Sequence, residues 1–81
     1  MLPELLNVKK TVGVKQSKRA IKENNARMAY IAADAEESLV GELTDLCAEH
    51  GVPAEFVPRM DELGRACGID VSAAVVVVLK D

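Results

Sequence analysis

The sequence predicts an α/β fold in which a small central sheet carries helices on both faces. Two observations support this prediction: short apolar segments alternate with helix patterns, and the connections between them are short. The length of 81 residues and the 49% hydrophobic content suit one small domain, so we expect residues 1–81 to form a single unit. A chain of this size has little room for a deep catalytic cleft beside its core, which favours binding over catalysis.

Three segments have the composition of strands. Residues 28–33 (MAYIAA), 54–57 (AEFV) and 72–80 (SAAVVVVLK) are short and apolar, and the last is rich in β-branched side chains. Apolar runs of this length are typical of strands that are covered on both faces. A further brief strand is expected around Thr11 and Val12.

Three other segments have helix patterns. Residues 37–50 (ESLVGELTDLCAEH) place apolar side chains on one stripe and acidic side chains opposite, which indicates an amphipathic helix lying on the sheet. Asp34 and Ser38 offer oxygens that could cap its N-terminus, and Gly51 follows its end. Shorter helices are expected over residues 60–67 (MDELGRAC) and 15–24 (KQSKRAIKEN).

The charge of the chain is divided unevenly. The net charge is −3, yet residues 1–27 carry seven basic and two acidic side chains, giving +5. The rest of the chain carries three basic and eleven acidic side chains, giving −8. A local positive field attracts polyanions whatever the total charge, while the acidic remainder discourages non-specific binding.

The basic helix pattern places Lys15, Lys18, Arg19 and Lys22 at i, i+3, i+4 and i+7, so their side chains share one helix face. Like charges at these spacings weaken an isolated helix, so we expect these four basic side chains to have a role other than stabilising the helix. A solvated surface is the default interpretation of such a face, and a nucleic-acid site is the functional one.

The start of this helix favours the functional interpretation. Gly13 allows close backbone approach, and the free N–H groups of residues 14–17 would form an anion site for a phosphate. Lys15 and Gln16 would project from the same end, where they could reach the hydrogen-bonding groups on base edges. Tyr30 and Phe56 are the only aromatic residues and both lie in strand patterns, so we expect no stacking platform for single strands.

The sequence carries no recognisable metal, cofactor or membrane signal. Cys47 and Cys67 lack a CxxC partner and His50 is the only histidine, so no zinc spacing exists. We expect both thiols to be reduced and buried in the core. No stretch of about 18 apolar residues and no signal-peptide pattern is present, from which we expect a cytoplasmic protein.

Three stretches, taken in their order and spacing, resemble the kink-turn-binding ribosomal protein superfamily, whose archaeal member is named L-seven-Ae. They are GVKQSKRAIKENNARMAYIAADA, LCAEHGVPAEFVP and ELGRACGIDVSAAVVVV, and the resemblance covers roughly residues 5–80. The short bacterial members, which are named ribosomal-protein-like or ribosome-associated, are the most similar. The resemblance implies a three-layer α/β/α sandwich with a four-stranded mixed sheet.

The resemblance also implies a site. In kink-turn binders, the start of the second helix contacts tandem sheared G·A pairs, and the loop before the last strand covers an extruded nucleotide. Together with the basic helix face, this gives an expected RNA-binding set of Gly13, Val14, Lys15, Gln16, Lys18, Arg19, Lys22, Ile69, Asp70, Val71 and Ala73. The expected partner is structured RNA, such as a kink-turn in ribosomal RNA or a riboswitch, with the ribosome as a candidate host and a monomer as the expected state.

The chain departs from the superfamily pattern at four positions. Archaeal and eukaryotic members carry an Asn-Glu pair where this chain has Lys15 and Gln16, and Ser17 replaces a Thr or Val. Arg59 stands where a Ser would cap the helix that begins near Met60, and losing such a cap costs about 1 kcal/mol.

Two other functions are considered. An enzyme using Asp34 or Cys67 is the least favoured, because no nucleophile with an adjacent base can be argued from the sequence, so we expect no enzymatic activity. A protein-interaction module of the same fold would use the acidic half of the chain, especially Glu36, Glu37, Glu42, Asp45 and Glu49.

Overall fold

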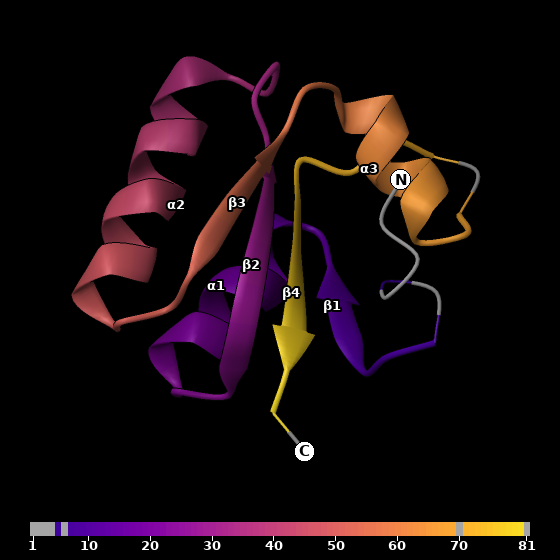
Figure 1. Cartoon of the computed structure of the whole chain (residues 1–81). Coiled ribbons are helices and arrows are strands. Elements are labelled where there is room, and N and C mark those ends of the chain that lie inside the picture. The colour runs from indigo at the N-terminus through magenta and orange to yellow at the C-terminus, as the bar shows by residue number, and fades with distance from the viewer. Residues whose placement is uncertain (1–4, 6, 70, 81) are drawn as a thin grey trace.

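The computed structural model describes residues 5, 7–69 and 71–80, and it shows three helices and a four-stranded sheet (Figure 1). The elements, in chain order, are β1 (Lys10–Val12), α1 (Val14–Lys22), β2 (Ala26–Ala32), α2 (Glu37–Glu49), β3 (Ala54–Val57), α3 (Met60–Ala66) and β4 (Val75–Leu79). The strand order is β1-β4-β2-β3. Strand β4 is antiparallel to both of its neighbours, whereas β2 and β3 are parallel, which confirms the mixed sheet.

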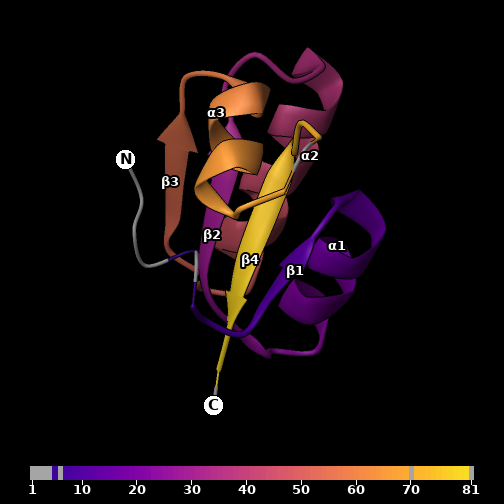
Figure 2. The same ribbon diagram turned by 90° about the vertical axis from the view of Figure 1, so that its right-hand side faces the viewer.

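Helices α1 and α2 cover one face of the sheet and α3 covers the other, which confirms the α/β/α sandwich (Figures 1 and 2). The central strand β4 contributes side chains to the hydrophobic core on both faces of the sheet. Val75 and Val77 pack with the residues of α1 and α2, whereas Val76 and Val78 pack with those of α3. All four are at most 2% exposed, because successive side chains of a strand point to opposite faces.

Strand β3 is less buried than its apolar composition predicts. It has the expected bounds, but Ala54, Glu55 and Phe56 are exposed and only Val57 is buried. The expectation that this strand is covered on both faces was therefore wrong. The reason is its position, because β3 lies at the edge of the sheet and pairs only with β2.

Asp34 caps a different helix from the one expected. No side chain of a described residue caps α2, and the Ser38 hydroxyl donates instead to Glu36 Oε1 at 2.6 Å. Asp34 Oδ1 accepts the backbone N–H of Met60 at 2.8 Å, so this carboxylate satisfies the first turn of α3. It therefore supplies the cap that Arg59 cannot provide, while Arg59 pairs with Asp61.

Replacing Asp34 by Ala is expected to destabilise the protein by about 1 kcal/mol. Among the described residues, Asp34 is the only one whose side-chain oxygen caps α3, and the substitution removes that oxygen. The midpoint of urea unfolding should fall accordingly. Asp34→Asn keeps an acceptor oxygen and should retain most of the stability. Equal losses in the two variants would assign the effect to the charge of Asp34 rather than to its hydrogen bond.

Candidate nucleic-acid interface

The start of α1 and the loop before β4 lie side by side, although they are far apart in the sequence. The N–H of Gly13 donates to the carbonyl oxygen of Val75 at 3.2 Å, and Val12 pairs with Val76 in the sheet. Val75 is the first residue of β4, and Ala74 joins it to the loop of residues 69–73. The two parts of the expected RNA-binding set therefore meet at one end of the sheet.

The first turn of α1 presents free backbone donors. Gly13 has φ = +111°, a conformation that L side chains rarely adopt, and no side chain of a described residue caps the helix. The carbonyl oxygen of Gly13 accepts the N–H of Ser17 at 3.1 Å. The expectation that the N–H of Ser17 is free to bind an anion was therefore wrong. The candidate anion site consists of the N–H groups of residues 14–16 only.

Ser17 anchors this helix end to the sheet. Its side chain is fully buried, and its hydroxyl lies 3.0 Å from the hydroxyl of Thr11 on β1. Val14 is partly buried and packs against the core beneath α1. The helix start is consequently held in place while its outer side stays open.

The basic side chains of α1 differ in their freedom. Lys15, Gln16 and Lys22 are exposed and have no hydrogen-bond or ion-pair partner within the described part of the chain. Lys18 is only 25% exposed, and its Nζ lies 2.8 Å from Glu42 Oε2 of α2. Arg19 Nε donates to Glu23 Oε2 at 3.1 Å.

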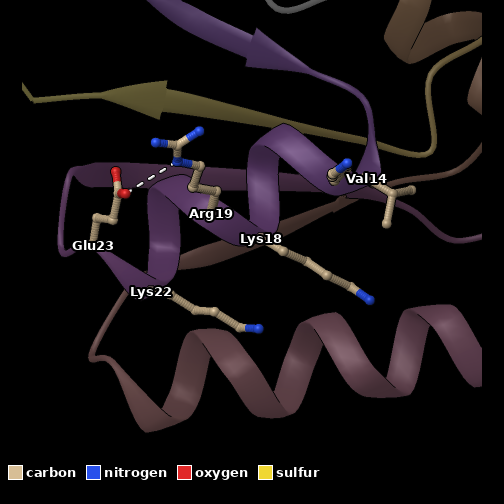
Figure 3. Close-up of a pocket in the computed structure, with 6 residues that line it drawn as sticks. Val14, Lys18, Arg19, Lys22 and Glu23 are labelled. Carbon is tan, nitrogen blue, oxygen red and sulfur yellow. Dashed lines mark hydrogen bonds and ion pairs between the residues drawn. The ribbon is translucent and has the colours of Figure 1, made fainter.

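The four basic side chains of α1 line a shallow hollow of about 590 Å³ on the outside of the helix. Figure 3 shows Lys18 and Lys22 extending toward α2, while Arg19 turns toward Glu23. The four cations therefore share one side of α1, as the spacing predicted, because all four line this hollow. Two of them are paired there, Lys18 with Glu42 of α2 and Arg19 with Glu23 of its own helix.

In the loop before β4, Ile69 and residues 71–73 are held against α3 and present an apolar side chain. The N–H of Ala73 donates to the carbonyl oxygen of Met60 at 3.1 Å, and Ala73 is buried. Ile69 is partly buried against the core, whereas Val71 is 68% exposed. Asp70, which belongs to the expected set, lies outside the described residues.

Gly64 permits this arrangement. A Cβ atom added at Gly64 would lie far inside contact distance of the carbonyl oxygen of Val71 and 3.2 Å from the Cα of Ser72. Both are backbone atoms of the loop, so they could move only if the loop moved. Beside them is a second hollow of about 250 Å³, which is lined by Asp61, Arg65, Ile69, Val71 and Ser72.

Sequence reasoning missed two residues that shape this site. Glu42 was assigned to an acidic face, but it neutralises Lys18 across the contact between α1 and α2. The helix pattern over residues 60–67 did not indicate the close contact that Gly64 makes with the backbone of Val71 and Ser72. Neither contact leaves a local signal, because each joins segments whose proximity depends on the whole topology.

No group of three His, Cys, Asp or Glu among the described residues could hold a metal ion, and none of the helices that the structure describes is long and apolar enough to cross a bilayer. Cys47 and Cys67 are free and buried, as expected. Burial raises the pKa of both thiols, an effect that the charge of Lys10 partly offsets at Cys67, so neither forms a thiolate readily.

The chain is similar in sequence to known proteins. Residues 5–81 match the ribosomal protein L7Ae/L30e/S12e/Gadd45 family. A protein of Caldanaerobacter subterraneus named RNA-binding protein TTE2299 is 44% identical over 66 residues, which are 82% of this chain and 80% of that protein. RNA-binding protein YbxF of Geobacillus stearothermophilus is 39% identical over 69 residues, which are 85% of this chain and 84% of that protein.

A solved structure described as the Giardia lamblia 15.5kD RNA binding protein superposes with a TM-score of 0.82 and 30% sequence identity. The match covers 89% of this chain, which spans 61% of the length of the Giardia chain. A second structure, from Bacillus halodurans, gives a TM-score of 0.80 at 24% identity and covers 88% of this chain and 71% of its own. This second likeness is evidence for the fold alone.

Proposed function

The chain belongs to the ribosomal protein L7Ae/L30e/S12e/Gadd45 family, and we propose that it is an RNA-binding protein that recognises kink-turns with tandem G·A pairs. The names of its bacterial relatives support RNA binding. The single observation that carries the proposal is the Gly13–Val75 hydrogen bond, because it sets the open start of α1 beside the loop of residues 69–73. One folded RNA element could contact both at once.

In this proposal the start of α1 reads guanine edges. The N–H groups of residues 14–16 and the helix dipole would favour a phosphate, and Lys15 would donate to the O6 and N7 acceptors of guanine. The amide of Gln16 can both donate to and accept from a base edge. Both side chains are exposed and unpaired among the described residues, so they need not break a contact first.

The loop would contribute shape recognition. Val71 is an exposed apolar side chain on a backbone that α3 holds firmly, and such a surface can cover an unstacked base. Ala73 is buried, so it would support the loop from below rather than touch RNA through its side chain. Structured elements of ribosomal or regulatory RNA are the proposed targets, bound by a monomer in the cytoplasm, on the ribosome or apart from it.

Glu42 would set the strength of binding through Lys18. Replacing Glu42 by Gln frees the Lys18 ammonium group, which the structure places 2.8 Å from that carboxylate. Because exposed ion pairs contribute about 0.2–1 kcal/mol, kink-turn affinity should rise by up to about fivefold in a binding titration.

Asp45→Asn is the matched control for this change. It removes the same charge from α2, and Asp45 has no ion-pair partner in the described ranges. A similar gain in both variants would mean that only net charge matters, and that Lys18 gains nothing from its release.

The bacterial relatives are named for RNA binding and give no support to a protein-interaction module that uses the acidic side chains of α2. The proposal is tested by titrating the protein against a kink-turn RNA and against a matched duplex without the tandem G·A pairs, at two salt concentrations. We expect tight binding to the kink-turn and weak, salt-sensitive binding to the duplex. Equal binding to both RNAs would reduce the site to a non-specific positive surface.

A further inference from the structure

The basic residues of the protein fall into paired and unpaired groups. Among its ten Lys and Arg residues, four have carboxylate partners, namely Lys18, Arg19, Arg59 and Arg65. The other six have no ion-pair partner among the residues that the structure describes. Two of these, Lys15 and Lys22, lie on α1 within the proposed site. The remaining four are here called the strand-end cluster: Lys9, Lys10, Arg27 and Lys80.

Backbone hydrogen bonds bring the members of this cluster together from both ends of the chain. The carbonyl oxygen of Lys9 accepts the N–H of Leu79 at 2.9 Å. The N–H of Lys80 donates to the carbonyl oxygen of Asn25 at 2.9 Å. Lys9 and Lys80 are both exposed, and they lie where β1 begins and β4 ends (Figure 1).

The other two members lie in the same rows of the sheet. Lys10 pairs with Val78 across the β1–β4 ladder. Arg27 is exposed and sits at an irregularity of β2, between the residues that pair with Leu79 and Val78. Because neighbouring strands are about 4.8 Å apart, the backbone positions of the four basic residues lie close together at this end of the sheet.

A hollow extends from the proposed RNA site toward the residues that form backbone hydrogen bonds with this cluster. It has a volume of about 250 Å³ and runs between α1 and the sheet, lined by Thr11, Gln16, Arg19, Ala20, Glu23, Asn25 and Leu79. Gln16 and Arg19 belong to the proposed site, whereas Asn25 and Leu79 are the backbone partners of the cluster. The stretch of β4 from Val75 to Leu79 spans about 13 Å, so both regions are within reach of one RNA.

We propose that the strand-end cluster is a second RNA contact, which holds the phosphate backbone of a duplex arm leaving the kink-turn. This inference rests on the proposed function and extends the interface along the molecule. Unpaired lysine and arginine side chains on an open surface bind phosphates and fix the position of a duplex, but they do not read its sequence. The cluster should therefore add affinity that depends on arm length and salt, without base preference.

The test compares a kink-turn RNA with short arms and the same RNA with each arm extended in turn by one helical turn. The variant Arg27→Gln/Lys80→Gln removes two charges from the cluster. Ser38→Glu/Ala48→Glu lowers the net charge by the same amount at exposed positions of α2 and serves as the control. All three proteins are titrated at several salt concentrations.

We expect wild type and control to bind one of the extended RNAs severalfold more tightly than the short one. Arg27→Gln/Lys80→Gln should bind the short RNA like wild type and gain nothing from extension. On the extended RNA, the slope of log K against log salt should be smaller by about 1.8, which is about 0.9 for each phosphate that the variant no longer neutralises.

Two other outcomes would overturn this inference and leave the proposed function intact. One is a full gain from arm extension in Arg27→Gln/Lys80→Gln, and the other is no gain in wild type. Failure of the proposed function would appear differently. Wild type would then bind the short kink-turn no better than a duplex of equal length without G·A pairs.

Discussion

Gly64→Ala is expected to destabilise the fold by about 1–3 kcal/mol and to weaken kink-turn binding far more than duplex binding. The added Cβ would overlap the carbonyl oxygen of Val71, and it would also lie only 3.2 Å from the Cα of Ser72. Neither atom belongs to a flexible side chain. The strain must therefore displace α3 or the loop of residues 69–73, and the loop carries the exposed Val71.

Gly41→Ala provides a matched control for this substitution. Gly41 lies within α2, and a Cβ there would meet nothing within 4 Å. Alanine at an open position inside a helix should stabilise the protein by about 0.5–1 kcal/mol and leave RNA binding unchanged. Urea unfolding and titrations with both RNAs measure these effects. If Gly64→Ala bound the kink-turn like wild type, the loop would have no part in recognition.

Lys15→Ala is expected to reduce kink-turn affinity by about 5- to 150-fold, because a good contact to a guanine edge contributes about 1–3 kcal/mol of discrimination. Lys15 is exposed and has no partner among the described residues, so its removal should leave the free energy of unfolding nearly unchanged. Binding to a duplex without G·A pairs should weaken only slightly. Isothermal titration with both RNAs gives the two affinities.

Lys22→Ala is the control that distinguishes a specific contact with a base from a general effect of positive charge. It removes the same charge from the same helix, but Lys22 lies at the opposite end of α1. Its loss should weaken binding to both RNAs by a similar small factor. Lys15→Arg should keep most of the affinity, because Arg can donate to the same O6 and N7 acceptors of guanine. Equal effects of Lys15→Ala and Lys22→Ala on the two RNAs would show that the helix acts as a charged surface only.

Much of the fold could be predicted from local patterns. Strand β3 begins and ends where expected, since Pro53 and Pro58 flank its apolar run. The last strand was expected over residues 72–80 but occupies Val75–Leu79, because residues 72–74 belong to the segment that the Ala73–Met60 hydrogen bond ties to α3. The position of β3 at the edge of the sheet and the contacts between helices could not be predicted from composition.

The candidate site was predictable to a similar degree. The open start of α1 follows from Gly13 and the basic helix pattern, which are both local. The pairing of Lys18 with Glu42 and the cap that Asp34 gives to α3 were not, because each joins residues of different elements. Such contacts depend on how the helices pack on the sheet. The sequence alone would allow each of these side chains several different partners.

The central claim is that the start of α1 and the loop of residues 69–73 bind one RNA together. Amide chemical shifts of the labelled protein, followed while kink-turn RNA is added, test it most directly. We expect residues 14–16 and the loop to shift together and to saturate at the same RNA concentration, with the acidic side of α2 unchanged. Shifts confined to α2, or a loop that stays unperturbed while α1 responds, would contradict the claim.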